Sequence, residues 1–507
     1  MSERDAFVVA ARRTPIGKLG GALRLLRVES LVAPLIRAVL TDAGLAATDV
    51  DEVVLGNVWG PGGNPARVAA LTAGIDARVP GLTIDRQCAS GLEAINLAAR
   101  LVQTGAAGVC LAGGVESAST APWRIDRPDS VYQTPAFSTR ARFAPDAAGD
   151  PEMGPAADAL ARAHGVSRER QDRFALSSHR KAIAAAREGR FASEIVALPA
   201  SNRAAALPPP PEGWEGAVEQ DQSPRARLTL RTLGRFPPAF ATRARFAPEA
   251  AGDPEMGPAA DALARAHGVS RERQDRFALS SHRKAVAAAR EGRFAGEIVA
   301  LPVSNRAAAL PRPPDGWEGA VERDQSPRAR LTLRTLARFP PVFSPDGTVT
   351  AGNASPINDG AALVAVVSGA VLRRLGAPAL RIVDGVAAGV DPALPGGGPI
   401  AATTALLRRN PGVDLSDVGV VEITEAFAGQ ALACLDALGI AEERANVGGG
   451  AIALGHPWGA SGAVLVCRLF TEMLRAGNPT PPPSGVATVA GAGGVGVATL
   501  VERVTPA

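Results

Sequence analysis

The chain has 507 residues, of which 46% are hydrophobic, 21% charged and 4% aromatic, and its formal net charge is +4. This is the composition of an ordinary globular protein, and it excludes the disordered and fibrous classes. Three lysines stand against 51 arginines, and no run of five like charges occurs. We therefore interpret the arginine excess as coding bias and expect no nucleic-acid partner.

Location and redox state follow from the cysteines and the N-terminus. The four cysteines are dispersed without a CxxC pair, which predicts reduced thiols in the cytoplasm. The first residues lack the apolar core of a signal peptide, and no apolar run reaches the ~18 residues of a membrane span. We expect a cytoplasmic protein that does not bind membranes.

Valine-rich strands alternate with amphipathic helices at both ends of the chain, which predicts α/β regions. In chain order we expect strand 6–11, helix 29–44, strand 82–84, helix 91–105 and strand 108–114. The second region predicts strands 363–368 and 380–389, a helix after residue 400, strand 418–424, helix 460–477 and strand 485–494.

A long tandem repeat separates the two α/β regions. Residues 136–238 recur as 239–341, with 94 of 103 positions identical, and helical patterns cover 154–166 and 168–191 of the first copy. Two copies are too few for a solenoid, and the period is too long. A tandem duplication of one segment, or an artefact of sequence assembly, explains the pattern, and one copy fewer leaves a 404-residue protein.

A cysteine lies where one predicted strand turns into a helix. Cys88 follows strand 82–84 and directly precedes a helix that starts near residue 89. The unpaired N–H groups and the dipole of a helix N-terminus favour a thiolate, so the position suits a nucleophile. A small buried structural cysteine explains the sequence equally well.

His456 lies in a second glycine-rich turn, GGGAIALGHPWGASG, and is the only histidine outside the repeat. Glycines in such a turn allow a ligand or another backbone to approach closely. A Cys–His pair supplies a nucleophile with a proton acceptor beside it, although a structural, hydrogen-bonded histidine is an equal alternative.

Cofactor and metal signatures are weak. The pattern Gly491–Gly496 matches GxGxxG, but only 11 residues follow it, too few for the βαβ unit and acidic residue of a dinucleotide site. The sequence contains no HExxH, CxxC or carboxylate array at ligand spacing. We expect neither a bound cofactor nor a metal.

Six segments, in this order, together resemble the thiolase family. They are ARRTPIGKLGGAL from Ala11, RQCASGLEAI from Arg86, AGGVESAS from Ala112, GTVTAGNASPINDGAA from Gly347, EITEAFAGQALA from Glu422 and GGGAIALGHPWGASGA from Gly448. Because the match spans nearly the whole chain, a merely shared fold does not explain it.

The resemblance implies a thiolase-like α/β fold with two similar halves, each a five-stranded sheet, in a five-layer αβαβα arrangement. The N-terminal half would be 1–118 plus 345–376 and the C-terminal half 377–507. The insert 119–344 would be a helical loop domain that is present twice. The resemblance also implies coenzyme A thioesters as substrates, a role in fatty acid metabolism, and a homodimer or homotetramer.

The resemblance assigns roles to particular residues. Cys88 would accept an acyl group from acyl-CoA, His456 would activate it, and Thr424 stands where the family's asparagine orders a water for an oxyanion hole. The residues that would bind coenzyme A are Arg328, Thr335 and Ser355. Those that would line the acyl pocket are Phe343 and Phe427. We assign these roles to Arg328 and Thr335 of the second repeat copy in preference to the matching residues of the first copy, Arg225 and Thr232. A hybrid of both copies is the alternative.

The chain departs from the family at three positions. Ala490 replaces the second cysteine, which is the acid/base that moves the α-proton; Thr424 replaces the asparagine; and Glu152 and Glu255 replace a histidine of many loop domains. The oxyanion hole formed by the backbone N–H groups of Cys88 and Ala492 would survive.

These departures leave three functions open. The leading prediction is a thiolase-type acyltransferase that condenses or cleaves 3-ketoacyl-CoA. Acyl transfer or thioester hydrolysis without carbon–carbon chemistry is the first alternative, because alanine at position 490 cannot transfer a proton. A non-catalytic relative that binds coenzyme A is the second.

Overall fold

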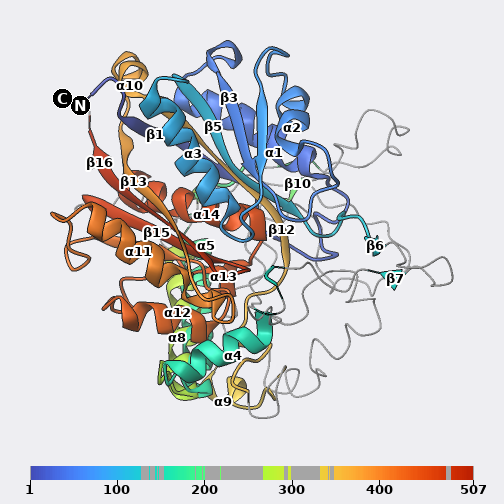
Figure 1. Cartoon of the computed structure of the whole chain (residues 1–507), viewed down its shortest axis with the longest axis vertical. Helices are drawn as coiled ribbons and strands as arrows, with labels where there is room; N and C mark the ends of the chain where they lie inside the picture. Colours follow the sequence, from blue (N-terminus) through green and yellow to red (C-terminus); the bar gives the residue numbers. More distant parts are fainter. Residues whose placement is uncertain are drawn as a thin grey trace.

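The computed structural model describes residues 2–126, 136–137, 143–145, 147, 153–188, 190–196, 198–199, 217–218, 267–290, 295–297, 332–340, 342, 347–475 and 481–505 (Figure 1). Within these ranges the fold is mixed α/β, and the predicted strands and helices of both flanking regions are confirmed.

The N-terminal half is a sheet with the strand order β4-β3-β5-β12-β1. Its strands are β1 (Ala6–Arg13), β3 (Glu52–Gly56), β4 (Gly81–Ile84), β5 (Val109–Ser117) and β12 (Asn358–Ser368), and the short β2 (Gly17–Lys18) pairs with β12. Its helices are α1 (Val28–Ala43), α2 (Pro65–Ala73), α3 (Ser90–Thr104) and α10 (Gly369–Leu375), with a 3-10 turn, η1 (Ala47–Asp49). Strand β12 follows the insert in sequence but lies antiparallel between β1 and β5.

The C-terminal half has the strand order β14-β15-β16-β13. Its strands are β13 (Ala379–Gly389), β14 (Val420–Ile423), β15 (Ser484–Gly491) and β16 (Val495–Val504). Its helices are α11 (Gly398–Arg409), α12 (Ala428–Ala437), α13 (Ala451–Leu454) and α14 (Trp458–Phe470), with short turns η5 (Pro395–Gly397) and η6 (Thr471–Arg475). Strands β15 and β16 form an antiparallel hairpin turned by Gly493 and Gly494 at φ 78° and 83°. The GxGxxG segment is therefore a hairpin and lacks the strand–helix geometry of a dinucleotide site.

The two halves share one hydrogen-bonded ladder. Strand β1 pairs antiparallel with β13 through Ala6–Ile382, Phe7–Arg381 and Val8–Leu380. We expected two separate five-stranded sheets, but in the described part of the chain the C-terminal half contributes four strands, and they continue the N-terminal sheet. An unpaired strand edge exposes backbone N–H and C=O groups. Pairing β1 with β13 satisfies these groups on the edge of the N-terminal strand group and on the edge of the C-terminal strand group at once.

Three hydrophobic cores define the layers. One packs α1 and α2 on the outer face of the N-terminal strands, and another packs α11 and α12 on the C-terminal strands. The third lies between the inner faces of the two strand groups and contains α3 and α14. Alternate residues of β1 serve different cores, because Phe7 faces α1 while Ala6 and Val8 face α3, as the two-residue period of a strand requires.

Helices α3 and α14 approach each other closely because glycines form their contact. A Cβ on Gly91 of α3 would lie 2.6 Å from the carbonyl oxygen of Gly459, and one on Gly462 of α14 would lie 2.5 Å from the amide nitrogen of Leu92. Both distances are shorter than a Cβ tolerates against backbone. The central layer is therefore held at a separation that only glycine permits.

The insert contributes short strands and helices from both repeat copies. The helices are α4 (Met153–Ala163), α5 (Arg168–Arg187), α8 (Arg271–Arg290) and α9 (Leu333–Leu336). The strands are β6 (Ile125–Asp126), β7 (Ala136–Phe137), β8 (Ala192–Ser193), β9 (Leu198–Pro199), β10 (Ala217–Val218) and β11 (Ala295–Glu297). Figure 1 shows α4 and α8 beside α12, at the edge of the C-terminal half, and α9 lies next to α5 and α8. The second copy of α4 falls outside the described residues.

Among the described residues, no helix combines the length and the apolar character needed to cross a bilayer.

Replacing Gly91 with alanine tests the close approach of α3 and α14. The new methyl group would meet the backbone of Gly459, and we expect G91A to lower the free energy of unfolding by about 1–3 kcal/mol. Gly412 has open space at its Cβ position, so G412A should change stability by less than about 0.5 kcal/mol. Urea unfolding of both variants measures the difference, and equal stabilities would contradict the tight contact.

Candidate active site

Cys88 lies in a strained turn between β4 and α3. The residue before it, Gln87, has φ 52°, a left-handed conformation that side chains other than glycine rarely adopt. The hydroxyl of Ser90 holds the turn closed, because it accepts from the Arg86 amide at 2.8 Å and donates to the Gln87 carbonyl at 2.5 Å. Asp85 accepts from the Gln87 amide at 2.7 Å. The turn therefore places Cys88 directly before the N-cap of α3, Ala89.

The surroundings of Cys88 differ from those of the other cysteines. Burial raises the pKa of the thiols of Cys110, Cys434 and Cys467 to about 12, so these three stay protonated and serve as packing residues. Cys88 is 7% exposed and lies at a helix N-terminus, where the dipole favours negative charge. Of the four, Cys88 has the position of a nucleophile.

His456 precedes α14 as Cys88 precedes α3. Its Nδ1 lies 2.7 Å from the Ser461 hydroxyl, which fixes the ring. Its Nε2 is buried and has no hydrogen-bond partner among the described residues. Burial lowers the pKa of His456 to about 4, so the ring is neutral at pH 7 and Nε2 can accept a proton if Nδ1 carries the hydrogen.

Two residues that support this turn were missed from the sequence. The Asn358 side chain accepts from the His456 amide at 3.0 Å and donates to the Gly17 carbonyl at 2.7 Å. Glu116 accepts from the amide of Gly459, in the first turn of α14, at 3.1 Å. Both lie inside the motifs quoted above, but they are 98 and 343 positions from their partners, so no local pattern indicates these contacts.

Glu116 holds the N-terminus of α14 against the N-terminal half. Besides Gly459, its carboxyl accepts from the amides of Val58 at 3.2 Å and Trp59 at 3.0 Å. Burial raises its pKa to about 7, although the three amides stabilise the charged form. A carboxyl group at this position complements the positive end of the helix dipole.

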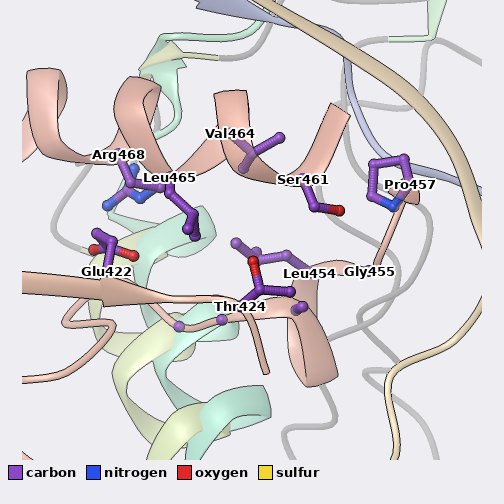
Figure 2. A pocket seen from close by; sticks show the side chains of 12 residues that line it. Glu422, Thr424, Leu454, Gly455, Pro457, Ser461, Val464, Leu465 and Arg468 are labelled. Atoms are coloured by element: carbon purple, nitrogen blue, oxygen red, sulfur yellow. The ribbon is translucent and has the colours of Figure 1, made fainter. Parts of the chain in front are cut away.

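Thr424 lines a small cavity beneath α14 (Figure 2). It follows β14, its side chain is 2% exposed, and its hydroxyl has no hydrogen-bond partner among the described residues. The cavity is bordered by Ser461, the partner of His456, and by Gly455 and Pro457 on either side of that histidine. The described residues that line it include neither Cys88 nor His456.

The position of the missing second cysteine lies beside the Cys88 turn. Ala490 is near the end of β15, and the next residue, Gly491, has its Cβ position 2.9 Å from the Arg86 carbonyl and 3.7 Å from the Ala89 methyl. Ala492 follows at 7% exposure. The β15–β16 turn therefore reaches the elbow that carries Cys88, with alanine where the resemblance expects a thiol.

The predicted binding residues are only partly described. Ser355 donates its amide to Ala426 at 3.0 Å and lies next to Ala354, which bridges to Phe427. Phe427 is buried in a small cluster with Ala156 and Ala157 of α4.

Thr335 is buried on α9, and its hydroxyl lies 2.8 Å from that of Thr332. The structure thus places Ser355 beside Phe427 but does not join Thr335 to them by a hydrogen bond. The other positions of this group fall outside the described residues: Arg328, Phe343, Arg225, Thr232, Glu152 and Glu255.

Within the described ranges, no group of three or more His, Cys, Asp or Glu side chains is arranged to hold a metal ion.

Two family models match the chain. The model described as "Thiolase, N-terminal domain" matches twice, over residues 6–247 and 245–370, and "Thiolase, C-terminal domain" matches residues 377–503. The first of the N-terminal matches contains the whole first repeat copy, and the second begins at residue 245, within the second copy, and continues past its end.

Curated relatives and a solved structure cover almost the whole chain. Two relatives, from Staphylococcus aureus strain MRSA252 and Staphylococcus haemolyticus strain JCSC1435, are both named "Putative acetyl-CoA C-acetyltransferase VraB". Each is 34% identical; the alignments cover 98% and 99% of this chain and 99% of each relative. The crystal structure of the Bacillus anthracis acetyl-CoA acetyltransferase has a TM-score of 0.70 at 28% identity and covers 99% of both chains.

The low pKa of His456 predicts a pH-dependent loss of stability. Between pH 6.5 and about 4 the unfolded chain protonates this histidine while the folded protein does not, so stability falls as the pH falls through this window. The variant H456N lacks the titrating ring. Lowering the pH from 7.5 to 5 should therefore cost the wild type about 1–2 kcal/mol more than H456N in urea unfolding, and parallel pH profiles would contradict a buried neutral His456.

Proposed function

Because the chain belongs to the thiolase family, we propose that it is an acyl-CoA C-acyltransferase in which Cys88 carries the acyl group as a thioester. One observation carries this proposal. Cys88 and His456 each precede a central helix, and the first turns of these helices touch backbone to backbone at Gly91 and Gly459. A thiol at a helix N-terminus and a neutral imidazole are the pair that thiol acylation requires.

Acylation then proceeds as a thiol–thioester exchange. The Cys88 sulfur attacks the carbonyl carbon of acyl-CoA, and its proton passes to Nε2 of His456. The tetrahedral intermediate collapses, the bond to the coenzyme A sulfur breaks, and the proton leaves with the coenzyme A thiol. One thioester replaces another, so the step is nearly isoenergetic.

The negative charge that develops on the carbonyl oxygen needs hydrogen-bond donors. The backbone N–H groups of Cys88 and Ala492 would form one oxyanion hole, which is supported by the contact of the β15–β16 turn with the Cys88 elbow. The unpaired Thr424 hydroxyl would serve the second, through a water in the cavity or directly.

Carbon–carbon chemistry depends on the α-proton of a second acyl-CoA. In condensation, the carbanion formed when that proton leaves attacks the acyl group on Cys88, and 3-ketoacyl-CoA is released; the reverse reaction is thiolytic cleavage. Ala490 offers no acid or base for this proton, and the absence of such a group typically costs about 10²–10⁴-fold in rate. Acyl transfer or thioester hydrolysis without this step is therefore the second candidate function.

The substrate contacts extend the same proposal. Ser355 and Arg328 would bind coenzyme A together with Thr335, and Phe427 and Phe343 would line the acyl pocket. The packing of Phe427 against α4 supports this assignment, because it brings part of the insert next to a residue that would line the acyl pocket. We further propose that the enzyme acts in the cytoplasm as a homodimer or homotetramer.

Acyl-enzyme trapping tests the nucleophile. Incubation with isotope-labelled acetyl-CoA, an acid quench and peptide mass spectrometry should locate one labelled acetyl group on Cys88. C88A should lose the label, C434A should keep it, and H456A should slow labelling about 10²–10⁴-fold. Unlabelled Cys88 under turnover conditions would overturn the proposal, and tight binding of coenzyme A without labelling would favour a non-catalytic relative.

Exchange of the α-protons of acetyl-CoA in deuterated water tests the role of Ala490. We expect slow exchange in the wild type and an increase of about 10²-fold or more in A490C, because a thiol restores an acid/base group beside the Cys88 turn. A490S is the size-matched control and should stay near the wild-type rate. Rapid exchange in the wild type would count against acyl transfer without carbon–carbon chemistry.

A further inference from the structure

Helices α5 and α8, which are the same element of the two repeat copies, meet the same surface of the C-terminal half. We call this surface the α5 docking surface; it consists of Glu425, Asp436, Glu442, Ala445 and Gly450. Glu425 is fully buried in it, and burial raises its pKa to about 7.

Three side chains of α5 make the contacts. Ser178 donates to the Glu425 carboxyl at 2.5 Å and accepts from the Gly450 amide at 3.2 Å. Lys181 donates to the Ala445 carbonyl at 2.7 Å. Arg170 pairs with Asp436 and Glu442, the latter at 3.2 Å.

The matching side chains of α8, each 103 positions later, bind the same groups. Ser281 donates to Glu425 at 3.1 Å and accepts from the Gly450 amide at 3.3 Å. Lys284 donates to the Ala445 carbonyl at 2.8 Å. Arg273 pairs with Asp436 and with Glu442, the latter at 3.1 Å.

The two helices also occupy the same space. The backbone of Gly268 lies where a Cβ of Gly165 would lie, and the rings of Phe174 and Phe277 overlap in one buried position that has room for a single ring. Figure 1 shows both helices interleaved beside α12 and α13. Close packing leaves no room for two backbones in the volume of one.

We propose that the α5 docking surface holds one repeat copy at a time and that the two copies exchange on it. The surface has one Glu425 carboxyl, one Asp436 carboxyl and one Ala445 carbonyl for two identical sets of donors. In each molecule one copy is docked and the other is displaced from this surface.

The two docked states have nearly the same free energy. All three contacting side chains are identical in the copies, and the same number of residues, 103, is looped out in both states: residues 239–341 when the first copy is docked and residues 136–238 when the second is docked. Loop-closure entropy grows only slowly with length, so this difference contributes little. Both docked states are therefore populated.

One small difference favours the first copy. Ile183, buried at 5% exposure in α5, is Val286 in α8, and one buried methylene corresponds to about a 2- to 10-fold preference. Glu194, which pairs with Arg13 at 2.8 Å and with Arg468 at 2.7 Å, is matched by Glu297 in the second copy, so these ion pairs do not distinguish the copies.

Hydrogen–deuterium exchange of the full chain measures this competition. Peptides from the two helices differ in mass by the methylene of Ile183, so each copy is followed separately in one sample. We expect partial protection in both copies, with protected fractions that sum to one and the larger fraction in the first copy. Full protection of both copies at once would overturn the proposal.

A matched pair of variants moves the equilibrium. Removing the buried ring in F174A should shift protection to the second copy by about 10²-fold or more, and F277A should shift it to the first. F174A/F277A should lose protection in both copies. Loss of protection in both copies of F174A alone, or unchanged protection in the first copy, would contradict exchange.

Single-copy chains provide the control. Deleting residues 136–238 or 239–341 leaves 404 residues with one copy, and either copy should then be fully protected. If the second copy stays unprotected when it is alone, it cannot dock and the exchange model is wrong. This readout does not depend on acyltransferase activity, so it stands apart from the test of Cys88.

Discussion

Two helix N-termini meet backbone to backbone in the centre of the molecule, and the rest of the structure depends on that contact. Gly91 and Gly462 lack the side chains that would separate α3 from α14. The inner faces of both strand groups then close over the two helices in one core. The same approach brings the Cys88 turn towards the His456 turn, so the packing constraint and the proposed chemistry share one cause. A larger residue at Gly91 would separate the layers and the two catalytic candidates together.

The segment from Thr424 to Phe427 connects the cavity to the loop domain. Thr424 faces the cavity beneath α14, while the next residue, Glu425, is the acceptor at the α5 docking surface. Phe427 packs against α4. Thr424 and Glu425 are adjacent in sequence but lie on the cavity and on the docking surface respectively, so one short segment serves both sides. Docking of a repeat copy on Glu425 therefore supports the backbone that positions Thr424 and Phe427.

Local patterns predict much of this fold. Apolar periodicity is enough for β1, β12, α1 and α3, and the turns that precede α3 and α14 indicate Cys88 and His456 as candidates. Pairing between distant segments carries no local signal: the join of β1 to β13 and the Asn358–His456 contact depend on tertiary packing. Strained backbone at Gln87 is likewise set by the hydrogen bonds of Ser90 and not by the residue type. The roles of Arg328 and Phe343 remain predictions from resemblance.

The repeat shows that a sequence can agree with its secondary structure at every residue and still not specify a single tertiary arrangement. Every residue of α8 agrees with helix as well as its twin in α5 does, and each copy complements the docking surface. A sequence specifies one structure only when the native arrangement lies well below its competitors in free energy. Here the competitor is a copy of the native element, so the energy gap shrinks to the few side chains that differ, such as Ile183 and Val286. The insert therefore has two alternative docked states because it contains the same helix twice, and not because either helix has a poor local propensity. The rest of the thiolase fold has one arrangement.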